Sequence, residues 1–136
     1  MRRVLITGSR NWSDRRVIHS ALFEELMVDT GQPEDVTVIH GAASGADSLA
    51  AWVASSLGMT TEAHPAQWDR PCEPQCFHKP RMKNGKPYCP LAGHLRNQHM
   101  VDLGADVCHA FPLLDSRGTW DCVRRAEKAG IRVVLH

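Results

Sequence analysis

The sequence has no long hydrophobic run and almost no net charge. No apolar stretch approaches the roughly 18 residues that a membrane-spanning helix needs, and the chain reaches Gly8 too soon for a signal-peptide core. Sixteen Lys and Arg residues against 15 Asp and Glu residues leave a formal charge of +1, without the positive field that non-specific nucleic-acid binding uses. We therefore expect a cytoplasmic protein with no membrane partner, and nucleic acid is not the expected ligand.

A fully paired set of cysteines is also lacking, because the chain has five. An odd number in a reducing compartment argues against a disulfide framework. Cys72, Cys76 and Cys89 fall in a polar, proline-rich stretch, whereas Cys108 and Cys122 lie singly in apolar patterns. We therefore expect two different roles for these cysteines, with Cys108 as part of the core.

The composition is that of an ordinary globular protein. Of the 136 residues, 43% are hydrophobic and 23% are charged. One domain usually takes roughly 100–200 residues, and a chain near this length buries roughly two-thirds of its unfolded surface. We predict a single folded domain over residues 1–136.

Short apolar runs alternate with stretches of helical periodicity. The strand candidates are Val4–Thr7, Val36–Ile39 and Val107–Phe111, with weaker ones at Thr60–His64 and Ile131–Leu135. Apolar residues recur at helical spacing from Val17 to Leu26 and from Leu49 to Leu57. This alternation predicts an α/β, Rossmann-like three-layer fold, with a mostly parallel sheet of about five strands and helices on both faces.

The alternation is interrupted between Trp68 and Gly93. This segment contains five prolines, which exclude a regular helix and a central strand. A loop of this length without secondary structure of its own is unusual in a compact domain unless something else orders it. We therefore treat residues 68–94 as a Cys/His-rich insertion within the domain.

The insertion carries thiol and imidazole groups that suit a metal. Three thiolates and one imidazole form a tetrahedral zinc set, and thiolates favour zinc over magnesium or calcium. We predict a structural zinc ion held by Cys72, Cys76, His78 and Cys89, with His94 as the alternative to His78. The other interpretations are thiols without a metal and a catalytic zinc, although a Cys3His set has no open position for water.

Four loops at the ends of predicted elements supply groups that bind phosphate. In open α/β sheets, ligands bind beyond the carboxyl ends of the strands, where small residues let them approach helix N-termini. The ligand-binding candidates are Gly8, Ser9 and Arg10; Gly41, Ala42, Gly45, Ala46 and Asp47; Arg96 and Asn97; and Arg117, Gly118 and Thr119. Neither glycine loop has the dinucleotide fingerprint or the Lys-Ser/Thr ending of a P-loop, which argues against standard NAD and ATP sites.

Other interpretations of these residues stay open. Gly41 and Gly45 would equally permit tight packing of a strand on a helix. Asp47 would either offset a helix dipole or hold a ribose hydroxyl. Arg96 would be a solvated surface residue or the partner of a phosphate or carboxylate.

Taken together, Gly8-Ser9-Arg10, Gly41–Asp47, Arg96-Asn97 and Ser116–Thr119 resemble the SLOG superfamily, in particular its YspA-type, cpYpsA-related family. The resemblance covers the chain apart from the insertion, and its most distinctive part is Gly-Ala-x-x-Gly-Ala-Asp. It implies a Rossmann-like fold that binds nucleotides or nucleotide-derived ligands as a sensor or processing protein. Relatives include the LOG phosphoribohydrolases and the DNA-processing protein DprA.

The chain departs from the LOG enzymes at one informative position. They carry Pro-Gly-Gly-x-Gly-Thr-x-x-Glu, and the glutamate position here is Cys122. Asp121 is one residue earlier and is turned about 100° around a helix. Whether the protein is an enzyme stays open; as an enzyme it would be a nucleotide N-glycosidase or phosphoribohydrolase-like hydrolase, with Asp121 and Arg96 as the catalytic candidates.

These observations favour binding of a nucleotide-derived small molecule, such as a nucleoside phosphate or an ADP-ribose-like compound, with N-glycosidic hydrolysis as an open addition. The alternative is a zinc-bearing nucleic-acid-binding module, in which Lys79, Arg81, Lys83 and Lys86 would grip a strand. Four cations over eight residues are, however, usually a solvated surface. The sequence leaves open whether the chain forms a homo-oligomer.

The zinc prediction is testable by elemental analysis of protein purified without added metal. We expect about one zinc ion per chain, because the metal would order the proline-rich segment. The double variant Cys72→Ser with Cys89→Ser should lose the zinc and melt at a lower temperature. Substoichiometric zinc, or unchanged folding of the double variant, would contradict the prediction.

Overall fold

The structure is a computed structural model that describes residues 1–28, 31–69, 81–83 and 85–136. A five-stranded parallel sheet with the order β3-β2-β1-β6-β7 forms its centre. The strands are β1 (Arg2–Gly8), β2 (Val36–His40), β3 (Thr60–Ala63), β6 (Val107–Phe111) and β7 (Arg132–Leu135). Each of the five predicted strands is confirmed, with ends that differ by at most two residues.

The burial of the strands explains the strength of their sequence signals. Every residue of β2 and of β6 is buried, as expected for strands covered on both faces. The edge strands β3 and β7 consist of exposed and half-buried residues, so their apolar patterns are weaker. The three central strands therefore carry most of the sheet's contribution to the core.

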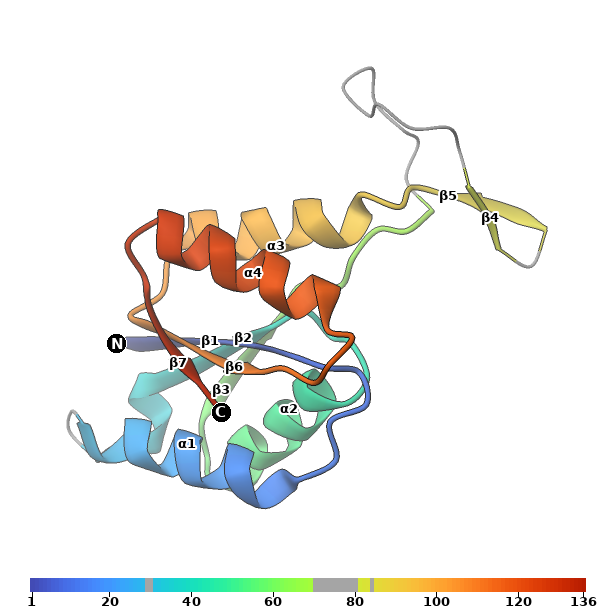
Figure 1. Cartoon of the computed structure of the whole chain (residues 1–136). Coiled ribbons are helices and arrows are strands. Elements are labelled where there is room, and N and C mark those ends of the chain that lie inside the picture. Colours follow the sequence, from blue (N-terminus) through green and yellow to red (C-terminus); the bar gives the residue numbers. More distant parts are fainter. Residues whose placement is uncertain (29–30, 70–80, 84) are drawn as a thin grey trace.

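Helices cover both faces of the sheet, as Figure 1 shows. Helices α1 (Arg15–Val28) and α2 (Ala46–Ser56) pack on one face, and a short 3-10 helix, η1 (Pro33–Asp35), precedes β2. Helices α3 (Ala92–Leu103) and α4 (Arg117–Lys128) pack on the other face. The buried apolar residues accordingly form two clusters, one on each side of the sheet. The predicted three-layer, Rossmann-like arrangement is confirmed.

The strand order places a switch point between β1 and β6. The chain first moves from β1 to β2 and β3 on one side, and later adds β6 and β7 on the other side of β1. The connections that leave β1 and β6 therefore run to opposite faces of the sheet. In open α/β sheets this divergence opens a crevice at the carboxyl ends of the two strands.

The insertion contains a hairpin that stands apart from the main sheet in Figure 1. Its strands are β4 (Arg81–Lys83) and β5 (Lys86–Tyr88), which pair antiparallel. The expectation of a segment without secondary structure of its own is therefore wrong here. The dipeptide Asn84-Gly85 is a strong hairpin signal in the sequence, and Pro87 is tolerated because a two-stranded hairpin has only edge strands.

Three of the predicted zinc ligands, Cys72, Cys76 and His78, lie outside the described residues, as does Lys79. In the described part of the chain, no group of three or more His, Cys, Asp and Glu side chains is placed to hold a metal ion. The zinc site thus stays a prediction.

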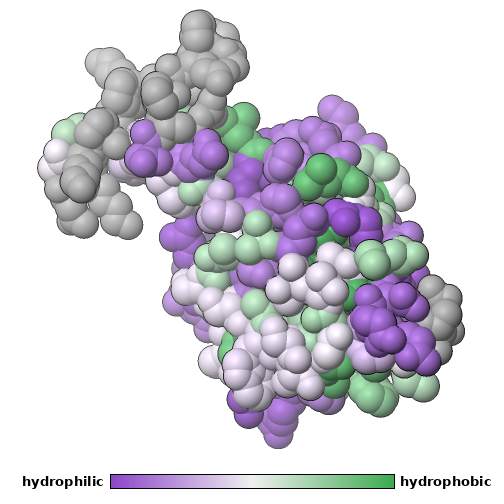
Figure 2. Space-filling model, turned by 180° about the vertical axis from the view of Figure 1, so that it is seen from behind, coloured by the Kyte–Doolittle hydropathy of each residue, from purple (hydrophilic) through white to green (hydrophobic). Residues whose placement is uncertain are grey.

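The helices of the described ranges differ from membrane-spanning helices. None of the helices there has both the length and the apolar character needed to cross a bilayer. Figure 2 shows the face opposite to that of Figure 1, where hydrophilic residues are spread over the surface and hydrophobic residues form small separate groups.

Candidate functional site

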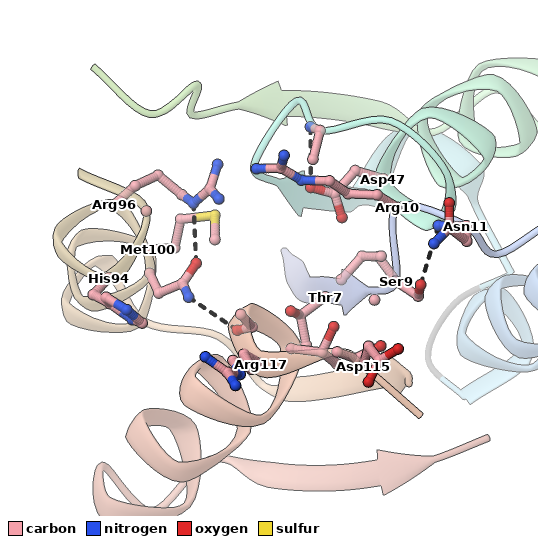
Figure 3. Close-up of a pocket in the computed structure, with 18 of the residues that line it drawn as sticks. Thr7, Ser9, Arg10, Asn11, Asp47, His94, Arg96, Met100, Asp115 and Arg117 are labelled. Carbon is pink, nitrogen blue, oxygen red and sulfur yellow. Dashed lines mark hydrogen bonds between the residues drawn. The ribbon is translucent and has the colours of Figure 1, made fainter. Parts of the chain in front are cut away.

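A cavity of about 370 Å³ lies at the carboxyl edge of the sheet, beside the ends of β1 and β6. Its walls come from the loop after β1, the start of α2, the first turns of α3 and α4, and Trp68. Figure 3 shows the labelled side chains converging on it from these elements. The predicted residues that line this main cavity are Gly8, Ser9, Arg10, Asp47, Arg96, Asn97, Arg117, Gly118 and Thr119.

The remaining predicted residues lie close by in other positions. Gly41 and Ala42 line a side cavity of about 290 Å³, which shares Arg10, Trp68 and other residues with the main cavity. Gly45 and Ala46 line neither cavity. The structure also adds residues outside the predicted ligand-binding set, among them Thr7, Asn11, Trp68, Met100 and Asp115.

Gly8 and Gly45 allow the first two loops to touch. Ala46 N donates a hydrogen bond to Ser9 O over 3.1 Å, which joins the start of α2 to the loop after β1. A Cβ atom at Gly8 would overlap the side chain of Ala46, and one at Gly45 would overlap the carbonyl groups of Ser9 and Arg10. Gly45 also has a φ of 71°, which L side chains rarely adopt. Tight packing, which the sequence left open for Gly45, accounts for both of these glycines.

Asp47 holds the loop between β2 and α2 and leaves one oxygen unused. Its Oδ2 accepts hydrogen bonds from Gly41 N at 2.9 Å and Ala43 N at 3.3 Å, across a turn in which Ala42 has a φ of 56°. Its Oδ1 is buried and has no hydrogen-bond partner among the described residues. Asp47 lines the main cavity, while this oxygen itself is almost fully shielded from solvent.

Burial raises the pKa of Asp47 to about 6, although the N–H groups of Ala43 and Gly41 and the guanidinium groups of Arg96 and Arg10 act in the opposite direction. Loss of hydration is therefore the dominant effect on this carboxyl group. A ligand that donates a hydrogen bond to Oδ1 would stabilise the charged form.

Arg96 connects α3 to two other loops. Its Nη1 donates to Gly41 O at 2.5 Å and to His64 O at 3.3 Å, and its Nε donates to Asn97 Oδ1 at 3.0 Å. Burial lowers the pKa of Arg96, and the charge of Asp47 counteracts this effect. Arg96 thus has a positioning role that the sequence did not indicate, and it lines both cavities.

Asp121 does not line the main cavity, but it binds and positions Asn97, which does. Its Oδ2 accepts hydrogen bonds from Asn97 Nδ2 at 3.0 Å and Arg125 Nε at 2.9 Å, and it lies 3.1 Å from His94 Nδ1. Burial raises the pKa of Asp121, but Arg125, Asn97 and His94 outweigh this and hold it below the ordinary value. The structure therefore keeps this catalytic candidate away from the cavity.

The first turn of α4, residues 117–119, forms part of the wall of the main cavity. Asn97 Nδ2 donates to Gly118 O at 3.2 Å, and Ser116 Oγ accepts from Leu113 N at 2.8 Å. A Cβ atom at Gly118 would meet no atom within 4 Å, so this position faces open space. A helix N-terminus with room in front of it attracts anions, and the guanidinium groups of Arg10, Arg96 and Arg117 line the same cavity.

Comparisons with known proteins agree with this architecture. The profile of the YAcAr family, described as the YspA, cpYpsA-related SLOG family, matches residues 2–70. The chain is 46% identical over 139 residues to the Gene 61 protein of Mycobacterium phage D29, covering 98% of this chain and 95% of that protein.

Two solved structures share the fold. DNA processing protein A (DprA) from Streptococcus pneumoniae matches 99% of this chain and 50% of its own, with a TM-score of 0.70 and 18% identity. DprA from Helicobacter pylori, whose structure describes a single-stranded DNA binding mode, matches 98% of this chain and 64% of its own, with a TM-score of 0.61 and 16% identity. The chain thus spans about half to two-thirds of these proteins, and the likeness shows the fold alone.

Gly45 and Gly118 give a matched pair of stability predictions. Gly45→Ala should lower the free energy of unfolding by more than about 1 kcal/mol, because the new Cβ meets backbone carbonyls at a positive φ. Gly118→Ala should leave it unchanged or raise it by up to about 1 kcal/mol, since the new methyl group enters open space on a helix. Urea denaturation of both variants measures this, and equal losses would contradict the assignment of Gly45 to packing.

Asp47 should make the stability of the ligand-free protein depend on pH. A folded-state pKa of about 6, above the ordinary 3.8, means that the ionised carboxylate costs stability, and this cost grows as the pH rises from 4 through 6. Relative to Asp47→Asn, the wild type should lose up to about 3 kcal/mol between pH 4 and pH 8. Urea titrations of both proteins at several pH values test this. A constant difference between them would show that Asp47 is not responsible.

Proposed function

Because the chain belongs to the YspA, cpYpsA-related SLOG family, we propose that its main cavity binds a phosphorylated, nucleotide-derived small molecule. The ligand class is a nucleoside phosphate or an ADP-ribose-like compound. Its phosphate lies at the first turn of α4, near Arg117 and Gly118. Its sugar hydroxyl groups face Asp47.

The unused oxygen of Asp47 carries this proposal. A buried carboxylate oxygen without a partner is costly, and it is satisfied by a hydroxyl donor such as that of a ribose. Figure 3 shows Asp47 and Arg117 on opposite sides of the main cavity. A ligand with hydroxyl donors at one end and a phosphate at the other matches this arrangement.

Binding is favoured over hydrolysis as the primary activity. Asp121 is held by three neighbouring side chains, and Cys122 is fully buried in the core between the sheet and α4. Neither residue is placed to activate water beside a ligand in the main cavity. The role proposed is therefore that of a sensor, and a processing activity would show as release of a free base. A structural zinc ion in the insertion is a separate part of the proposal.

Single-stranded DNA is a second candidate ligand, because the similar Helicobacter pylori protein is described with a single-stranded DNA binding mode. The strands of the hairpin also carry Arg81, Lys83 and Lys86. In a mobility-shift assay at physiological salt, binding of a single-stranded oligonucleotide that survives competition by nucleoside phosphates would favour this candidate.

The proposal is tested with AMP, ADP-ribose and ribose 5-phosphate by isothermal titration calorimetry. The wild type should bind at least one of the three, and a ligand at 100 times its Kd should stabilise the fold by about 2.7 kcal/mol. Gly118→Glu should abolish binding without loss of stability, because its carboxylate would occupy the anion position at the helix N-terminus.

Leu114→Glu is the matched control, since it adds the same charge at a fully exposed position that lines neither cavity. It should bind like the wild type. Failure of all three compounds to bind, or wild-type affinity in Gly118→Glu, would contradict the proposal.

A further inference from the structure

Trp68 is the aromatic ring that connects the two cavities. It lines the main cavity and the side cavity, and no other Trp, Tyr or Phe among the described residues lines either one. Trp68 is 38% exposed, so a substantial part of the residue is open to contact. Large aromatic surfaces that remain accessible beside a polar cavity are typical of stacking sites for planar groups.

The position of Trp68 is well defined by its neighbours. Its carbonyl oxygen accepts a hydrogen bond from Cys89 N at 2.9 Å. The ring of Tyr88 meets it edge-on at 6.4 Å, and the absence of a side chain at Gly93 lets the indole lie close to the start of α3. The indole is therefore held in place before any ligand arrives, which lowers the entropy lost on binding.

The side cavity has the charge and shape for a planar, electron-rich group. The Arg10 guanidinium carbon lies 5.8 Å from the centre of the Trp68 ring, and Arg96 lines the same space. No Asp or Glu among the described residues lines it. It is also lined by Gly41, Ala42, Ala43 and Ser44, whose small side chains leave room for a flat ring.

We propose that the side cavity is a base subsite, in which the indole of Trp68 stacks on the nucleobase of the ligand beside the Arg10 guanidinium. This inference rests on the proposed function, because it assumes a phosphate and a sugar in the main cavity. It assigns the ligand to the compounds that carry an aromatic base, and it excludes base-free sugar phosphates as the preferred ligand. Trp68 is thereby the residue that determines this specificity.

The experiment compares AMP with ribose 5-phosphate, which has the same sugar and phosphate and lacks the base. By isothermal titration calorimetry, the wild type should bind AMP roughly 5- to 100-fold more tightly, the range expected for one base–aromatic stack. Trp68→Leu should lower the AMP affinity to that of ribose 5-phosphate and change the ribose 5-phosphate affinity by less than about twofold. Trp68→Phe should restore part of the preference for AMP.

The matched control is Trp120→Leu, because Trp120 is also 38% exposed but lines neither cavity. It should keep the wild-type preference. Equal wild-type affinities for the two compounds, or equal weakening of both in Trp68→Leu, would overturn the base subsite while the proposed function stands. Failure of both AMP and ribose 5-phosphate to bind would overturn the base subsite, and failure of ADP-ribose as well would overturn the proposed function.

Discussion

The close contact between the loop after β1 and the start of α2 is the constraint on which the candidate site depends. Gly8 and Gly45 have no side chains at the points where the two segments meet, and the bond from Ala46 N to Ser9 O joins them. This contact directs Arg10 to one side of the main cavity and sets Asp47 in its wall. Any widening of the contact would move both side chains. The positions of Arg10 and Asp47 in the main cavity therefore depend on how tightly these two segments pack.

The buried carboxylate of Asp47 organises the loop between β2 and α2. Asp47 supports the strained turn at Ala42, while Arg96 binds the neighbouring carbonyl of Gly41. The loop between β2 and α2 is thus held by a carboxylate on one side and a guanidinium on the other. Loss of hydration still raises the pKa of Asp47, so the ligand-free site carries an electrostatic cost that a hydroxyl donor would reduce.

The fold was predictable because buried parallel strands leave continuous apolar runs, and because the glycines and polar residues at their ends mark the edge where ligands bind. The roles of individual residues were less predictable. A glycine that admits a neighbouring backbone, such as Gly45, has the same sequence signature as one that faces the open space of a cavity, such as Gly118. Trp68 was missed as a site residue because its place beside the cavities depends on contacts with Cys89 and Gly93, more than 20 positions away.

The hydrogen bond from Cys89 N to Trp68 O joins two parts of the candidate site that are far apart in the sequence. It lies just before α3, the helix that supplies Arg96 and Asn97 to the main cavity. One backbone bond therefore fixes the aromatic ring that lines both cavities relative to the polar wall of the main one.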